Sequence, residues 1–283
     1  MNIIVAKNSG FCFGVERSLK LALSASKEAS GNKKPLPVYT LGPLIHNPQV
    51  VSSLEKKGIK VVCDLKKIKK GVLIICSHGV SPESLKHAKR KKLKIIDATC
   101  PFVQKTQKLV HDLLRKKYQV VIVGDSSHPE VLSLLGFSSE KGIVVSGVKD
   151  IAKVAFASKT GVVAQTTQLI SNLKDVVSHL LDRTSELRVY NTICEATLQR
   201  QKAARALAGK VDLMIIIGGY NSANTTRLAE VCKQQNPESY HIEKLADFDM
   251  SLLKGRKKIG ITAGASTPQW LVNEVVEALA KID

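Results

Sequence analysis

Three stretches of the sequence repeat one order of parts: a short apolar run, a turn that contains a cysteine, and a helical pattern. The three cysteines are Cys12, Cys100 and Cys194. Cys12 and His78 are separated by 66 residues, and so are Cys100 and Thr166. Self-similarity at a fixed period indicates a repeated architecture. This repeat constrains the fold more than any single motif does.

Each repeat alternates apolar strands with helical patterns, which favours a small, largely parallel sheet. We predict an α/β fold of three pseudo-repeated small domains. They cover residues 13–98, 99–190 and 191–283. The first two repeats end with a helix and then a strand that leads to the next cysteine, whereas the third ends at a helix over 270–282. The missing strand is Asn2–Ala6, so residues 1–12 should complete the third domain.

Length and composition support a buried aliphatic core. The chain has 283 residues, of which 44% are hydrophobic and 4% aromatic, so Val, Ile, Leu and Ala must fill most of the interior. No apolar run approaches the length of a membrane-spanning helix, and Met1–Ser9 lacks a signal-peptide core. We therefore expect a cytoplasmic protein that does not enter a membrane.

Six cysteines in such a chain indicate thiolate chemistry or metal binding rather than a disulfide framework. Cys63, Cys76 and Cys232 lie within apolar strand or helix patterns, and we predict that they are small buried hydrophobic residues. The three repeated cysteines instead precede helices, and Pro101 suits a first helical position. A thiolate there lies at the positive end of a helix, where ionisation is favoured.

The net charge of +19 indicates solvated basic faces or an anionic partner. Lysines cluster at residues 66–70, 86–94 and 115–117. An anionic substrate, an acidic protein and nucleic acid are each compatible with this charge. The sequence has no zinc-finger spacing, no aromatic RNA-binding motif and no low-complexity basic tail, which argues against nucleic acid.

Polar side chains follow the predicted strands, at the strand ends where open parallel sheets bind ligands. They are His46, Ser77, His78, His128, Glu130, Gln165, Thr166, Thr167, Asn221, Ser222, Asn224 and Ser266. Hydroxyl, amide and imidazole groups at helix starts can bind phosphate, although Ser222, Asn224 and Ser266 are individually also ordinary helix caps. The sequence lacks a P-loop and a Gly-x-Gly-x-x-Gly turn, so nucleotide binding is not indicated.

Glu130 is the only carboxylate in these turns, which makes it a candidate general acid beside the histidines. If the repeats surround a pseudo-threefold axis, Cys12, Cys100 and Cys194 converge at its centre. Three thiolates can bind zinc with one open position, or an iron–sulfur cluster in which one iron lacks a protein ligand. Spacing alone leaves both possibilities open.

Eight motifs together resemble the LytB/IspH family of 4-hydroxy-3-methylbut-2-enyl diphosphate reductases, and they span the whole chain in the family's order. They are Phe11-Cys12-Phe13-Gly14-Val15, His46-Asn47, Ser77-His78-Gly79-Val80, Asp97-Ala98-Thr99-Cys100-Pro101, His128-Pro129-Glu130-Val131, Gln165-Thr166-Thr167, Asn221-Ser222-Ala223-Asn224 with Arg227-Leu228-Ala229, and Thr262-Ala263-Gly264-Ala265-Ser266.

The resemblance implies a trefoil of three α/β domains around a [4Fe-4S] cluster. Cys12, Cys100 and Cys194 would hold this cluster and leave one iron without a protein ligand. The implied reaction is the last step of the methylerythritol phosphate route of isoprenoid synthesis. Two electrons and two protons expel the substrate hydroxyl as water, which gives isopentenyl and dimethylallyl diphosphates.

The resemblance also implies individual roles. The residues that would hold the diphosphate are His46, His78, Ser222, Asn224 and Ser266. His128 would bind substrate and assist proton delivery, Thr166 would orient the hydroxyl, and Glu130 would supply the proton. An acidic electron donor such as ferredoxin or flavodoxin is implied, and we expect a monomer or weak homodimer.

Two residues depart from the family pattern. Ala223 stands where a second serine is usual, so one hydroxyl contact to the diphosphate is absent. Glu195 directly follows Cys194, and its charge could lower the cluster potential if it points inward. There are two alternative classes. A zinc hydrolase would be colourless and stable in oxygen. A nucleic-acid-binding protein would hardly be affected by replacement of its cysteines.

Overall fold

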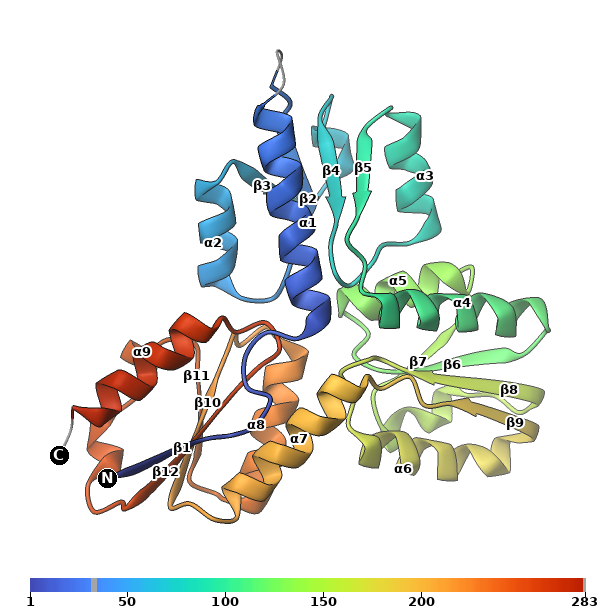
Figure 1. Cartoon of the computed structure of the whole chain (residues 1–283). Coiled ribbons are helices and arrows are strands. Elements are labelled where there is room, and N and C mark those ends of the chain that lie inside the picture. Colours follow the sequence, from blue (N-terminus) through green and yellow to red (C-terminus); the bar gives the residue numbers. More distant parts are fainter. Residues whose placement is uncertain (32–34, 282–283) are drawn as a thin grey trace. The chain divides into compact units, whose positions relative to one another are not determined.

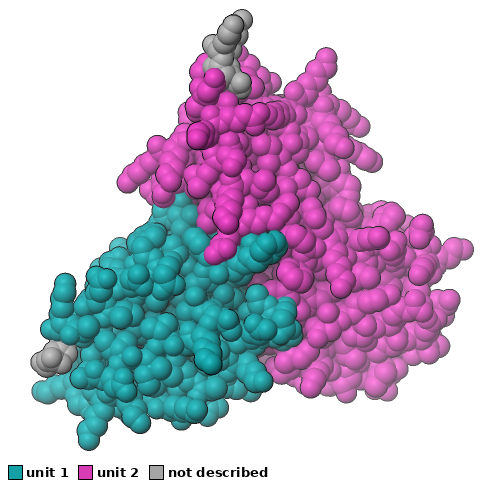
Figure 2. Space-filling model, viewed as in Figure 1, with its two compact units in different colours: residues 1–15, 45–50, 195–283 teal, residues 16–44, 51–194 magenta. Residues whose placement is uncertain are grey.

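The computed structural model describes residues 1–31 and 35–281, which form three four-stranded sheets (Figure 1). The chain divides into two compact units (Figure 2). Unit 1 comprises residues 1–15, 45–50 and 195–283, and unit 2 comprises residues 16–44 and 51–194. The α/β class is confirmed, and the boundaries of three separate domains stay a prediction. Ile282, the predicted end of the last helix, lies outside the described residues.

Unit 1 contains a parallel sheet in the order β1-β12-β10-β11. Its strands are β1 (Asn2–Val5), β10 (Leu213–Ile217), β11 (Ser239–Ile242) and β12 (Lys258–Ala263). Ile3 pairs with Ile259 in the β1–β12 ladder. The predicted pairing of the N-terminal strand with the last sheet is therefore present.

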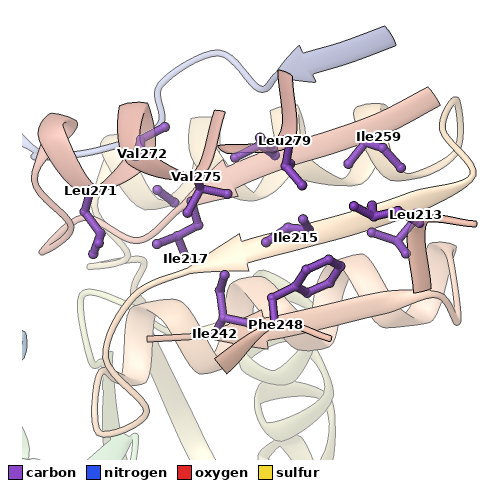
Figure 3. Packing of buried hydrophobic residues seen from close by; sticks show 13 residues of the cluster. Leu213, Ile215, Ile217, Ile242, Phe248, Ile259, Leu271, Val272, Val275 and Leu279 are labelled. Carbon is purple, nitrogen blue, oxygen red and sulfur yellow. The ribbon is translucent and has the colours of Figure 1, made fainter. Parts of the chain in front are cut away.

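Both faces of the unit 1 sheet are apolar, as expected for parallel strands covered by helices. Leu213, Ile215 and Ile217 of β10 pack with Leu271 and Val275 of α9 (Gln269–Ala280) on one face (Figure 3). The intervening side chains Met214 and Ile216 belong to a second cluster. That cluster includes residues of α7 (Glu195–Ala208) and α8 (Ala223–Gln235). Because successive side chains of β10 point to opposite faces of the sheet, this strand contributes to two hydrophobic cores.

Unit 2 contains the other two parallel sheets, in the orders β3-β2-β4-β5 and β7-β6-β8-β9. The strands are β2 (Val38–Leu41), β3 (Ile59–Val62), β4 (Val72–Ile75), β5 (Lys94–Asp97), β6 (Gln119–Val123), β7 (Ile143–Val145), β8 (Ala157–Ala164) and β9 (Thr184–Tyr190).

The remaining α-helices are α1 (Phe13–Ser30), α2 (Pro48–Lys56), α3 (Pro82–Arg90), α4 (Pro101–Arg115), α5 (Pro129–Phe137) and α6 (Ile170–Leu180). Short 3-10 turns cover Leu65–Lys67, Val148–Lys153, Leu181–Arg183, Leu245–Asp247 and Met250–Leu253.

The three sheets share one strand order. In each, the first strand after the cysteine-led helix lies between the second and the third, and a fourth strand pairs with the third. The fourth strand is β5 in one sheet and β9 in another, and β1 fills that place in the third sheet. This common topology confirms the repeat that the cysteine spacing predicted.

The helices begin as their sequences indicate. Pro82, Pro101 and Pro129 each occupy the first turn of α3, α4 or α5, where a missing N–H leaves no hydrogen bond unmade. No helix within residues 1–31 and 35–281 is long and apolar enough to span a membrane.

One prediction about the cysteines is wrong. Cys63 is exposed because β3 ends at Val62 and the chain then turns outward. Cys76 and Cys232 are buried as predicted, and burial raises the pKa of each thiol to about 12.

Candidate active site

In unit 1, the side chains of two serines meet beside the backbone of His46. Ser222 caps α8, and its Oγ accepts hydrogen bonds from the backbone N–H of Thr225 at 3.4 Å and the Thr225 hydroxyl at 3.1 Å. The Ser266 hydroxyl follows β12 and donates to the carbonyl oxygen of His46 at 3.1 Å. Its Oγ also lies 3.5 Å from that of Ser222. Segments distant in sequence therefore place His46, Ser222 and Ser266 together.

Two glycines permit this close approach. A Cβ on Gly264 would lie 2.0 Å from the Thr225 Oγ1, and one on Gly219 would lie 2.8 Å from the carbonyl oxygen of His46. Any larger residue would push α8 away from these turns. The glycines thus allow the serine hydroxyls and the start of α8 to form one polar surface.

The polar surface in unit 1 suits an anion. Asn224 is 7% exposed, and among the described residues its side-chain Nδ2 has no hydrogen-bond partner. It lies in the first turn of α8, where backbone N–H groups and the helix dipole favour negative charge. Burial lowers the pKa of His46, so the free protein holds this imidazole neutral more readily than water does.

In unit 2, Glu130 and Thr166 form a buried pair. Glu130 is 1% exposed, and its Oε1 accepts the backbone N–H of Thr166 at 2.6 Å. Its Oε2 accepts the Thr166 hydroxyl at 2.7 Å. A carboxyl group held at both oxygens has a fixed orientation, which a general acid requires.

Two histidines of unit 2 meet beside this pair. The Nδ1 of His128 accepts the backbone N–H of Glu130 at 3.1 Å and caps α5. This bond requires an unprotonated Nδ1, so the neutral ring has its proton on Nε2. The ring of His78, which follows β4, contacts that of His128 edge to face with centroids 5.2 Å apart.

The three repeated cysteines have the same local environment. The backbone N–H groups of Cys100 and Cys194 donate to the carbonyl oxygens of Ser77 and Thr166 in unit 2, at 3.0 and 2.9 Å. In unit 1, Cys12 donates to Ala265 at 3.2 Å. Each cysteine is partly exposed and immediately precedes a helix or its first turn. These three cysteines are therefore less buried than Cys76 and Cys232.

Two supporting residues of the site were not predicted from the sequence. Arg200 of α7 is 3% exposed, and in unit 1 it donates to the carbonyl oxygen of Gly10 at 2.8 Å, two residues before Cys12. In unit 2, Gln107 of α4 donates to the hydroxyl of Ser133 of α5 at 2.8 Å. Polar residues on otherwise apolar helix faces were the available signal, but they do not reveal their partners.

These features define an α/β protein with a repeated sheet topology, partly buried cysteines at helix starts and polar groups at the carboxyl ends of its strands. Its sequence matches the LytB protein family over residues 3–280. The chain belongs to this family, and the family predicted from the eight motifs is confirmed.

Relatives match the chain over its whole length. One is 4-hydroxy-3-methylbut-2-enyl diphosphate reductase from Geotalea uraniireducens (strain Rf4), which is 50% identical over 100% of this chain and 98% of the relative. The protein of the same name from Pelobacter propionicus (strain DSM 2379 / NBRC 103807 / OttBd1) is 48% identical over 100% of this chain and 99% of the relative.

Solved structures agree with the fold. A structure of (E)-4-hydroxy-3-methyl-but-2-enyl diphosphate reductase, the terminal enzyme of the non-mevalonate pathway, is 44% identical with a TM-score of 0.72 and full coverage of both chains. The E-1-hydroxy-2-methyl-but-2-enyl-4-diphosphate reductase from Plasmodium falciparum is 29% identical with a TM-score of 0.92. This match covers 99% of this chain and 88% of that one.

Proposed function

We propose that this chain reduces (E)-4-hydroxy-3-methylbut-2-enyl diphosphate to isopentenyl and dimethylallyl diphosphates. The allylic C–O bond breaks, two electrons and two protons are consumed, and the oxygen leaves as water. Family membership supports the reaction. The single observation in the structure that best supports it is the buried Glu130 carboxyl group, whose two oxygens both bond to Thr166.

The diphosphate would be bound by the residues predicted from the family: His46, His78, Ser222, Asn224 and Ser266. The Asn224 Nδ2, which has no hydrogen-bond partner among the described residues, and the neighbouring Ser222 and Ser266 hydroxyls support this role within unit 1. Ala223 supplies no hydroxyl at the start of α8, so only its backbone N–H can serve the anion.

Cys12, Cys100 and Cys194 would hold a [4Fe-4S] cluster with one iron lacking a protein ligand. Their donor chemistry fits, because each of these cysteines is only partly buried and lies at a helix start, and cysteine thiolates are the usual protein ligands of such clusters. Burial disfavours ionisation of Cys76 and Cys232, which makes these two unsuitable ligands. When bound, the cluster supplies the electrons and a Lewis-acidic iron for the departing hydroxyl.

The side chains of unit 2 would deliver the proton to the leaving oxygen of the substrate. Thr166 bonds to both Glu130 oxygens, so its hydroxyl can orient the substrate hydroxyl while Glu130 delivers a proton to the leaving oxygen. His128 directly precedes Pro129 and Glu130, and its neutral ring presents an N–H at Nε2 for substrate or proton transfer.

An acidic electron donor such as ferredoxin or flavodoxin would supply reducing equivalents. Exposed lysines on unit 2 support docking by charge complementarity. They include Lys66, Lys67, Lys69, Lys70, Lys86, Lys89, Lys92 and Lys94. The donor's reduction rate should fall as salt rises, and a salt-independent rate would contradict this docking. We place the enzyme in the reducing cytoplasm, as a monomer or weak homodimer.

The test is anaerobic oxidation of reduced viologen by the iron-loaded protein, with and without the hydroxymethylbutenyl diphosphate. Substrate-dependent oxidation that yields both isoprenoid diphosphates supports the proposal. Cys100→Ser should lose iron and activity together and serves as the control for adventitious reduction. A protein with intact iron and sulfide that gives no substrate-dependent oxidation would contradict the assigned reaction, and a colourless zinc protein would indicate a hydrolase.

A further inference from the structure

Gln107 is a buried polar residue to which the proposed reaction gives no role. It lies on α4, is 6% exposed, and its Nε2 donates a hydrogen bond of 2.8 Å to the Oγ of Ser133. Ser133 lies on α5 and is 2% exposed. Both residues belong to unit 2. A buried hydrogen bond between two side chains on different helices fixes their relative position more narrowly than apolar contact does.

A third segment meets this bond at Gly79. A Cβ on Gly79 would lie 2.3 Å from the Gln107 Nε2 and 3.2 Å from the Ser133 Oγ, so the glycine backbone packs directly against the pair. Gly79 has a φ of +74°, in the left-handed region that favours glycine. The turn after β4 is therefore held by both helices.

Each of the three segments contains a residue of the proposed site. Gly79 directly follows His78, α5 begins directly after His128 and includes Glu130, and α4 begins directly after Cys100. The edge-to-face contact of His78 with His128 joins the turn after β4 to the start of α5, and the Gln107–Ser133 pair packs against that same turn at Gly79.

We propose that Gln107 is a positioning residue, which acts through Ser133 and Gly79 to hold His78 at a fixed distance from His128. The assignment of roles to these histidines rests on the proposed function. Loss of the Gln107 amide leaves the buried Ser133 hydroxyl without its donor and frees the turn that contains His78. The His78 ring would then lose its alignment with His128, which is proposed to assist proton delivery.

The experiment compares Gln107→Met and Ser133→Ala with the wild-type holoenzyme. Gln107→Met preserves side-chain length and removes the donor, and Ser133→Ala removes the acceptor. The matched control is Thr106→Val, on the same helix. Thr106 is 1% exposed and bonds only to the Phe102 carbonyl oxygen of its own helix among its described hydrogen bonds, at 3.0 Å. The Thr106→Val variant therefore loses a buried hydrogen bond within α4, and this loss does not break a bond between two helices.

Kinetics give the first measurement. We expect kcat to fall about tenfold or more in both test variants, because small misplacements of reacting groups are costly, with KM changed less than twofold and iron content preserved. Thr106→Val should lose thermal stability while its kcat stays near wild type. The double variant should lose less than the product of the two single losses, because it leaves no unpaired partner. A kcat in Gln107→Met equal to that of Thr106→Val would overturn the proposal.

Crystal structures of the variant holoenzymes give the second measurement, which does not depend on the assigned reaction. The His78 and His128 ring centroids, 5.2 Å apart in the wild-type chain, should separate in Gln107→Met and Ser133→Ala but not in Thr106→Val. An unchanged separation overturns the positioning role whatever the activity. If the wild-type holoenzyme forms no product, the proposed function fails, and the ring separation still decides the role of Gln107.

Discussion

Glu130 and Thr166 form a closed pair: both carboxylate oxygens of the glutamate accept hydrogen bonds from the same threonine, at 2.6 and 2.7 Å. Thr166 also offers its carbonyl oxygen to the backbone N–H of Cys194 at 2.9 Å. One residue thus connects the proposed proton donor to the backbone of a proposed metal ligand. The orientation of the acid and the position of the thiol are therefore set by the same turn.

Glu130→Gln should lower kcat by about a hundredfold or more, because the amide keeps the shape of the side chain but has no acidic proton. Substrate affinity and iron content should be unchanged. Single-turnover assays and equilibrium binding of the diphosphate measure these effects separately. Glu83→Gln, at an exposed position in the first turn of α3, should retain full activity as the control. Turnover retained in Glu130→Gln would remove this residue from the mechanism.

Ser222→Ala and Ser266→Ala should mainly weaken substrate binding. Each leaves a phosphate oxygen without a hydroxyl donor, which costs about 1–3 kcal/mol. Ser222→Ala also removes the cap of α8 and should lower the free energy of unfolding by about 1 kcal/mol. KM and urea unfolding are measured together to separate the two effects.

The control for these serines is Ser53→Ala on α2, since Ser53 is exposed. It should leave both KM and unfolding close to wild type. A normal KM in both Ser222→Ala and Ser266→Ala would exclude the two hydroxyls from diphosphate binding.

His46 should make substrate binding dependent on pH. Burial lowers its pKa below 6.5 in the free protein, and a bound anion favours the imidazolium and raises that pKa. Binding should therefore take up a fraction of a proton, up to about one. Affinity should rise as the pH falls from 8 toward 6. Calorimetry in two buffers of different ionisation enthalpy measures the uptake, and His46→Asn should lower it.

The same lowered pKa has an effect on folding. The folded protein resists protonation of His46, so its contribution to stability is complete above pH 6.5 and is lost as the pH falls toward the folded-state pKa. His241 acts in the same direction, because burial also lowers its pKa. Unfolding of the ligand-free protein should therefore become easier below pH 6.5, with a shallower slope in His46→Asn. An equal slope in that variant would contradict this origin.

Arg200→Met should loosen the turn before Cys12. The buried guanidinium donates to the carbonyl oxygens of Gly10 at 2.8 Å and Ala196 at 3.0 Å. Loss of these charged hydrogen bonds should destabilise the protein by about 2–4 kcal/mol and reduce iron retention. Arg205→Met, at an exposed position on the same helix, is the control. Iron analysis and thermal unfolding test both variants, and equal iron content in the two would argue against the role of Arg200.

Alkylation should distinguish the three cysteines outside the repeat. Cys63 is exposed and should react with iodoacetamide in the folded holoprotein, whereas burial and a pKa of about 12 should protect Cys76 and Cys232. Peptide mass mapping identifies the labelled positions, and Cys63→Ser should abolish the rapid label. Rapid labelling of Cys232 would show that α8 opens readily.

Strands that consist of a continuous apolar run could be located from the sequence, whether they lie inside a sheet or at its edge. The runs Ile143–Val145 and Leu213–Ile217 are apolar throughout, and they coincide with β7 and β10. In β8 the apolar run covers only Gly161–Ala164, whereas the strand begins at Ala157. Its first residues include the exposed Ser158 and Lys159, which do not follow an apolar pattern. Cys63 was misassigned for a related reason: an apolar run does not reveal the residue at which a strand ends.

The site could be predicted by residue type but not by contact. Strand ends and helix starts indicated Glu130 and Thr166 separately, yet their shared hydrogen bonds follow from the placement of β8 beside β6. The Gln107–Ser133 bond joins two helices whose relative rotation depends on packing, which the sequence pattern does not specify. Hydrogen bonds between buried polar residues on neighbouring helices could therefore be identified only from the structure.

The pairing of β1 with β12 has a consequence for synthesis on the ribosome. Ile3 is synthesised well before its partner Ile259, which lies 256 residues further along the chain. At about 5–20 residues per second, β1 waits roughly 13–50 s for β12. During translation the sequence of unit 2 is complete before that of unit 1. In the nascent chain, β1 would therefore stay unpaired and available to chaperones until β12 emerges.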